Sequence, residues 1–311
     1  MKKSKGNHKN VNLITEKRKT QLFYNFLMLP SVILLILFSY VPMFGIIMAF
    51  QNFNPVKGFL GSDFVGFKNF TRLFTMQNVH LVIRNTLFIA ISKIILDIIV
   101  PVTFALLLNE VRSRAFVRVV QTVTYLPYFL SWVILSGVFI EILSPSGGLI
   151  NNILGHFGVD PIFFLGNKKW FPHIVIWTDT WKNFGFSAII YLAALTGIDP
   201  TLYEAAKVDG ASHLQQVFHV TLPGITAIVI LMTVLSIGGI LDAGFDQIFN
   251  MYNPLVYETG DVLDTFVYRL GIKDMAFSLS AAVDLLKSVI SLILILTSHK
   301  MADKFAGYRV F

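Results

Sequence analysis

Residues 199–247 have the sequence DPTLYEAAKVDGASHLQQVFHVTLP followed by GITAIVILMTVLSIGGILDAGFDQ, and the contrast between these halves decides the fold. The second half is an almost unbroken apolar run. A helix needs about 20 such residues to cross a hydrocarbon core of roughly 30 Å. The first half is polar and contains helix-capping residues. The sequence therefore predicts a transmembrane helix preceded by a structured polar segment.

Similar apolar runs occur along the whole chain of 311 residues, of which 55% are hydrophobic and only 14% charged. Lipid cannot satisfy the backbone of an open strand, and the alternating strands of a barrel are absent. The fold class is therefore predicted to be all-α, a polytopic membrane protein in one domain. We expect six spans, at about 22–50, 84–108, 119–142, 172–194, 224–247 and 276–298.

The basic residues predict the orientation, because cytoplasmic ends of spans are enriched in Lys and Arg. They gather in the tail 1–21, in the loop 109–118 and in the tail 299–311. We therefore expect these segments and the loop 199–223 to be cytoplasmic, and the loops 51–83, 143–171 and 248–275 to lie outside. This distribution explains the net charge of +7 without nucleic-acid binding. The residues concerned are Lys2, Lys3, Lys5, Lys9, Lys17, Arg18, Lys19, Arg112, Arg114, Arg118, Lys300, Lys304 and Arg309.

The cytoplasmic loop 199–223 is longer than a connection between two spans needs, and its residues predict two short helices. Asp199-Pro200 is typical of a helix start, and Gly210 of a helix end in left-handed conformation. A second helix is expected from about Ser212 to Val220, ending before Pro223. From the pattern alone, an amphipathic hairpin lying on the lipid surface is an open alternative.

The run YEAAKVDGASHLQQVFHVTLP (Tyr203–Pro223) resembles the EAA loop of permease subunits in binding-protein-dependent ABC importers. The resemblance implies a type I importer permease fold and docking of the loop in a groove of a separate ATPase, with Glu204 facing a basic residue there. Val220 replaces the more usual Ile of the pattern. The matching residues, which we expect at this contact, are Glu204, Ala205, Ala206, Asp209, Gly210, Ala211, Leu222 and Pro223.

Two further runs, NPVKGFLGSDFVGFKNFTRLF (Asn54–Phe74) and IWTDTWKNFGFSAIIYLAAL (Ile176–Leu195), are similar to permeases of complex-carbohydrate importers, the lipoprotein/polysaccharide permease subfamily. This resemblance implies import of an oligosaccharide derived from a plant or algal polysaccharide across the bacterial cytoplasmic membrane. It also implies a second permease, expected to be a different homologous chain, two ATP-binding subunits and an extracytoplasmic solute-binding protein. ATP and Mg²⁺ would be bound by the partner ATPase and no cofactor by this chain.

A polar-to-aromatic stripe in the fourth predicted span suggests where a sugar could pass. Asp179, Lys182, Asn183 and Phe186 are spaced as on one helix face, and Trp181 lies on a neighbouring face. Ionisable groups within spans usually face a bundle interior or a watery path. Helix pairing, or anchoring at the membrane interface, is the alternative role of these residues.

Other charged residues within the spans are expected to have structural roles. Lys93 and Asp97 are four residues apart, and Asp284 and Lys287 three, so each pair could neutralise itself on its own helix. Asp242 and Asp246 have no basic neighbour in the sequence. They need a partner from another helix, or they lie outside the hydrocarbon.

Enzymatic motifs are missing. The segment from Gly61 to Lys68 has P-loop glycine spacing but Phe67 where Lys is required, and the chain has no Cys, HExxH or GxSxG. We therefore predict no metal site and no catalytic residue. Two other classes stay open: an ion-coupled secondary transporter using carboxylates such as Asp97 or Asp242, and a membrane-embedded transferase, for which no constellation is present.

Overall fold

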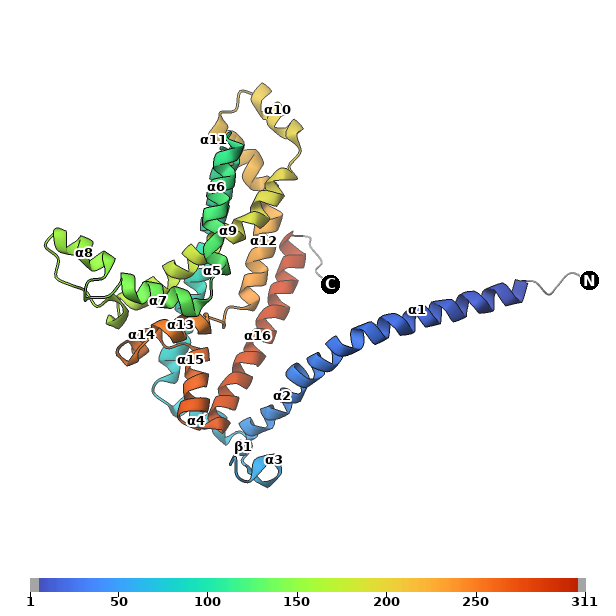
Figure 1. Ribbon diagram of the computed structural model, residues 1–311, viewed down its shortest axis with the longest axis vertical. Helices are drawn as coiled ribbons and strands as arrows, with labels where there is room; N and C mark the ends of the chain where they lie inside the picture. The colour runs from blue at the N-terminus through green and yellow to red at the C-terminus, as the bar shows by residue number, and fades with distance from the viewer. Residues whose placement is uncertain (1–5, 307–311) are drawn as a thin grey trace, which may run out of the picture.

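The computed structural model describes residues 6–306, with side chains described for residues 20–300 and 303. It is an assembly of long helices with one small antiparallel pair of strands, as the predicted all-α class requires (Figure 1). Its helices and strands are α1 (Gly6–Leu35), η1 (Ile36–Tyr40), α2 (Val41–Met43), η2 (Phe44–Phe50), β1 (Gln51–Asn52), α3 (Gly58–Gly61), β2 (Asp63–Phe64), α4 (Lys68–Thr75), α5 (Val79–Asn109), α6 (Arg114–Tyr125), η3 (Leu126–Phe129), α7 (Trp132–Ile142), α8 (Leu149–His156), η4 (Phe164–Gly166), α9 (Trp170–Thr196), α10 (Pro200–Val208), α11 (His213–Gln216), η5 (Val217–Thr221), α12 (Leu222–Gly238), α13 (Phe245–Met251), η6 (Pro254–Val256), α14 (Tyr257–Gly260), α15 (Leu263–Tyr268), η7 (Arg269–Lys273) and α16 (Phe277–Ala306).

The helix α1 begins inside the segment that the sequence predicted as a cytoplasmic tail. The basic side chains expected to orient the two ends of the chain, apart from Lys300, lie outside the described side chains. They are Lys2, Lys3, Lys5, Lys9, Lys17, Arg18, Lys19, Lys304 and Arg309.

Four helical segments are long and apolar enough to cross a membrane: Thr20–Phe50, Val79–Asn109, His213–Gly238 and Phe277–Lys300. Two bent pairs meet the same criterion, so the count reaches the predicted six if each pair is one span. In the first pair, Arg114–Phe129 and Trp132–Ile142 meet at 103°. The predicted third span is therefore sharply broken near Leu130.

In the second bent pair, α9 and α10 meet at 68°. The bend falls at Gly197–Asp199, where the Asp199 side chain caps the following helix. The helix α10 is thus the first helix of the predicted cytoplasmic loop, and α9 alone corresponds to the predicted fourth span.

The fifth predicted span is wrong at both ends. Its helix does not begin after Pro223, because α11, η5 and α12 form one continuous helix from His213 to Gly238. Pro223 lies inside this continuous helix, directly after the π-helical turn η5, which interrupts the regular ladder of backbone hydrogen bonds next to the missing proline N–H. The helix ends at Gly238, and the chain reaches α13 only after Gly244, whose φ is +95°.

The helices α5 and α9 form the centre of the bundle, and α12 packs against α16. One core cluster joins Ile89 of α5, Val175 of α9 and Ile248 of α13, and a second one joins Ala105, Ala188 and Ile225. The α1 helix, by contrast, runs away from this bundle (Figure 1). Two of the phenylalanines that follow it, Phe38 and Phe44, are 76% and 77% exposed.

The crossing of α6 and α9 depends on Gly185. A Cβ atom built there would lie 2.3 Å from the backbone oxygen of Thr124, so only glycine allows this approach. Small residues commonly permit such close contacts between helices in membranes.

We predict that Gly185→Ala lowers the stability of the purified protein, because the new methyl group forces α6 and α9 apart. Overpacking of this kind costs about 1–3 kcal/mol. Gly137→Ala in α7 is the matched control, since a Cβ atom there meets nothing within 4 Å. Thermal unfolding in detergent measures both variants, and equal midpoints would contradict the proposed role of Gly185.

Candidate functional site

The loop 199–223 has the two helix starts that its sequence predicts. Asp199 Oδ1 accepts a hydrogen bond from the Thr201 backbone N–H at 2.9 Å, which holds the pKa of this carboxyl below its usual value. Gly210 has φ +79° and turns the chain after α10. Ser212 and Gln215 form a capping box that opens α11, with Gln215 Oε1 accepting from Ser212 N at 2.7 Å. The capping and turn predictions are confirmed.

This pair of helices exposes a large apolar surface. Leu202, Val208, Leu214 and Phe218 are 52%, 88%, 72% and 63% exposed. Glu204 is exposed as well and has no side-chain partner among the residues described. Large apolar side chains exposed together on short helices are typical of an interaction surface.

A cavity of about 260 Å³ lies between the two helices. Its lining comes from the residues that the sequence singled out, including Ala206, Asp209, Gly210 and Ala211. Small side chains at these positions leave the groove open to an approaching partner.

Two contacts attach this loop to the spans. The Tyr203 hydroxyl and Thr221 Oγ1 are 3.0 Å apart, which joins α10 to η5. His213 Nε2 lies 2.6 Å from Glu110 Oε2, at the end of α5. Because α11 continues without a break into α12, displacement of the loop would be transmitted to that span.

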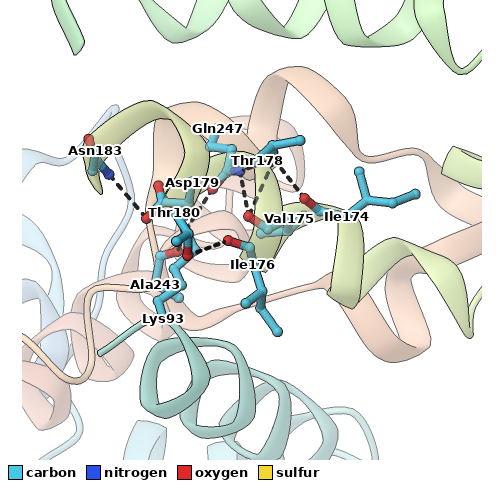
Figure 2. A network of polar contacts seen from close by, with 10 residues as sticks. All are labelled: Lys93, Ile174, Val175, Ile176, Thr178, Asp179, Thr180, Asn183, Ala243 and Gln247. Carbon is cyan, nitrogen blue, oxygen red and sulfur yellow. Dashed lines mark hydrogen bonds and ion pairs between the residues drawn. The ribbon is translucent and has the colours of Figure 1, made fainter. Parts of the chain in front are cut away.

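A buried polar network connects α5, α9 and the start of α13 (Figure 2). Lys93 Nζ donates to the Ala243 backbone oxygen at 2.9 Å and to Gln247 Oε1 at 2.6 Å, and lies 3.3 Å from Asp179 Oδ1. Gln247 Nε2 donates to Val175 O at 2.7 Å and to the Thr178 hydroxyl at 2.8 Å. Every polar group of the Gln247 amide is therefore engaged.

Lys182 likewise donates a hydrogen bond to a backbone carbonyl, at the break of the third predicted span. Its Nζ donates to the Tyr128 backbone oxygen at 2.7 Å, at the end of η3. The same ammonium lies 5.1 Å from the centre of the Tyr128 ring and 5.7 Å from that of Trp132, within cation–π range.

These contacts favour a role in helix pairing, rather than in the substrate pathway, for Asp179, Lys182 and Asn183. Asp179 and Lys182 are buried, and Asn183 donates to Asp179 Oδ2 at 3.2 Å. The aromatic members lie at the surface: Trp181 packs edge-on against Phe139, and Phe186 stacks on Tyr128.

The predicted local charge pairs are not the ion pairs that form. Lys93 pairs with Asp179 rather than Asp97, and Lys287 pairs with Asp264 rather than Asp284. The reason is packing: Lys93 and Lys287 meet acids of neighbouring helices, which bury the charges together. Helical spacing alone gives no indication of such partners.

A cavity of about 900 Å³ lies between the α1–η2 segment and the helices α15 and α16. Its charged wall contains Asp242, Asp264, Asp284 and Lys287, and Tyr268 adds an aromatic face. Asp242 has no basic neighbour in the sequence, and it lines this cavity together with charged groups of α15 and α16. Asp264 and Gln247 were missed, because their partners are distant in the sequence and no motif marks them.

No cluster of three or more His, Cys, Asp or Glu that could hold a metal ion occurs in the described part of the chain.

We predict that Lys93→Met destabilises the protein by about 3–5 kcal/mol, because it leaves Asp179 charged and buried without its partner. The double variant Lys93→Met/Asp179→Leu should recover part of this loss, since no unpaired charge then remains. Chemical unfolding in detergent measures the effect. A double variant less stable than the sum of the single changes would contradict the pairing.

Comparison with known proteins assigns the family. Residues 97–298 match the family described as binding-protein-dependent transport system inner membrane component. A polygalacturonan/rhamnogalacturonan transport system permease protein, YteP of Bacillus subtilis (strain 168), is 43% identical over 303 residues, which cover 95% of this chain and 94% of YteP.

Solved structures agree. A chain of a bacterial ABC transporter involved in the import of the acidic polysaccharide alginate superposes with a TM-score of 0.85 and is 36% identical, covering 94% of this chain and 99% of that chain. A chain from the alginate transporter in complex with a pentasaccharide-bound periplasmic protein gives a TM-score of 0.84 at the same identity, covering 94% and 97%. The chain therefore belongs to the binding-protein-dependent transport system inner membrane component family and is a multi-pass permease subunit of an ABC transporter.

Proposed function

We propose that this chain is a permease subunit through which an oligosaccharide derived from a plant or algal polysaccharide crosses the bacterial cytoplasmic membrane inward. The observation that carries the proposal is the near full-length similarity to permeases of two polysaccharide transport systems. One relative is named for polygalacturonan and rhamnogalacturonan, and the solved transporter imports alginate. Both cargoes are acidic polysaccharides, so an acidic oligosaccharide is the proposed cargo class.

The energy would come from ATP and Mg²⁺ bound on two separate ATPase subunits. The docking surface for one of them is the pair α10 and α11, with its exposed Val208 and Leu214 and the unpaired carboxylate of Glu204. Docking there rather than on lipid is supported by the free Glu204 and by the groove between the helices. Closure of the ATPase dimer would then move α12 through the continuous helix.

A second permease would cover the apolar surface that α1 and α2 leave exposed. No residue of η1 or α2 is buried, although most of their residues are apolar. We propose a different homologous chain as this partner, with the termini and the loops 109–118 and 199–223 facing the cytoplasm. An extracytoplasmic solute-binding protein would deliver the cargo on the opposite side.

The cargo would pass along the cavity beside α15 and α16. Sugars offer hydroxyl donors and apolar C–H faces, which suit carboxylates and aromatic rings. Asp242 and Asp284 are exposed in this wall, whereas Lys287 is engaged by Asp264. This wall therefore suits the hydroxyl-bearing side of an acidic oligosaccharide, and the groups that face its carboxylates would belong to the second permease.

Uptake into proteoliposomes that contain the whole complex tests the proposal. We expect uptake of a labelled oligogalacturonide to require the binding protein and internal ATP, and to stop when ATP hydrolysis is blocked. Uptake that continues without ATP and is abolished by an ionophore would instead establish an ion-coupled transporter.

We predict that Glu204→Lys reduces transport by about tenfold or more, because the reversed charge would face a basic groove of the ATPase. Like charges brought together at an interface cost several kcal/mol, and each 1.4 kcal/mol is about tenfold. The control is Asp160→Lys, the same reversal at an exposed position of the opposite loop. Wild-type transport and ATPase assembly in Glu204→Lys would overturn the docking role.

A further inference from the structure

A second groove lies at the end of the bundle that carries α10 and α11, but on different helices. It has a volume of about 370 Å³ and lies where α5 ends, α6 begins and α9 passes alongside. Its polar wall contains Arg114, Arg118 and Gln121, and its apolar wall Leu108, Val117 and Leu192. The transport mechanism proposed above does not use this groove.

The groove is strongly basic. Arg112, Arg114 and Arg118 are exposed, and none of them takes part in an ion pair within the described part of the chain. The acid nearest in sequence, Glu110, is engaged by His213 at 2.6 Å. Arg114 and Arg118, which line the groove, and Arg112, which is close to them in the sequence, are thus left without a counter-ion in the described part of the chain.

The backbone adds to this positive potential. Helix α6 has twelve residues and begins at Arg114, with Ser113 Oγ accepting from Phe116 N at 3.4 Å. The N–H groups of its first turn and the positive end of its dipole favour an anion beside the arginines.

The surface next to the arginines is apolar. On α6, Phe116, Val119 and Val123 are 56%, 61% and 65% exposed, and they continue from the groove along the span. An anionic head beside the arginines with an apolar chain along this face has the chemistry of a phospholipid. A soluble anion would use only the arginines, and an acidic protein surface would leave the apolar face uncovered.

We propose that this groove binds the phosphate head group of an anionic phospholipid of the cytoplasmic leaflet, with its acyl chains along the exposed face of α6. Basic pockets between spans on the cytoplasmic side are suited to such head groups. The proposal rests on the cytoplasmic orientation assumed for the proposed function. Through Glu110 and His213 the bound lipid would lie one contact away from the coupling helix α11.

The test measures phospholipid retained by the purified complex. The complex is delipidated in detergent, titrated with phosphatidylglycerol or phosphatidylcholine, and analysed by native mass spectrometry. We expect phosphatidylglycerol to be retained preferentially, and Arg114→Gln/Arg118→Gln to weaken its binding at least about tenfold, since each basic residue near an anionic surface contributes about fivefold. Arg114→Lys/Arg118→Lys should retain most of the binding and shows that loss is not due to unfolding.

The matched control is Lys68→Gln/Arg72→Gln on α4, which removes two exposed basic residues on the opposite side. Equal losses in the control and the arginine double variant would overturn a specific site. Equal retention of phosphatidylglycerol and phosphatidylcholine would overturn the assignment to an anionic head group. Loss of the ATPase subunits with unchanged lipid retention would show a protein interface instead. Lipid binding is measured without transport, so a failure here is distinguishable from a failure of the proposed function.

Discussion

The break of the third predicted span and the link that follows α12 each present a backbone carbonyl inside an apolar bundle, and two buried lysines donate hydrogen bonds to them. In a membrane interior no water is available to donate hydrogen bonds to these carbonyls, and an unsatisfied carbonyl costs several kcal/mol. Lys182 donates to Tyr128 O beside the break of the third span, and Lys93 to Ala243 O beyond the end of α12. Asp179 accompanies Lys93, so this charge is not buried alone. The central helices α5 and α9 thereby hold the broken third span and the link after α12 in position.

This arrangement distinguishes two parts of the molecule: the packed centre formed by α5 and α9, and one long helix that would transmit a displacement of the loop 199–223. This helix runs without a break from His213, in the loop 199–223, to Gly238. Beyond its far end, Gly238 and Gly244 bracket a short non-helical link, and Ala243 within it is bonded to Lys93. A force applied at α11 would therefore reach the link next to the buried network. The same link carries Asp242 into the wall of the large cavity.

Helix caps and turns, which depend on neighbouring residues, were predictable from the sequence, whereas ion pairs between distant segments were not. The cap at Asp199 and the left-handed turn at Gly210 depend only on neighbouring residues, so both predictions were correct. The ion pairs of Lys93 and Lys287 depend on which helices pack together, and helical spacing pointed to Asp97 and Asp284 instead. Pro223 was mistaken for a helix end because a preceding π-helical turn cannot be recognised from residue types.

The loop proposed to receive the energy of ATP hydrolysis and the cavity proposed for the cargo differ in the same way. The loop 199–223 is built from local signals and carries the resemblance to the family, but it contacts no sugar in the proposed mechanism. The cavity wall is built from residues of three separate segments, and it offers two exposed carboxylates beside a lysine that is already paired. Such a wall repels the carboxylates of an acidic oligosaccharide. Cations for that cargo would then have to be supplied across the cavity, and a second permease with a different sequence can provide them where a second copy of this wall could not.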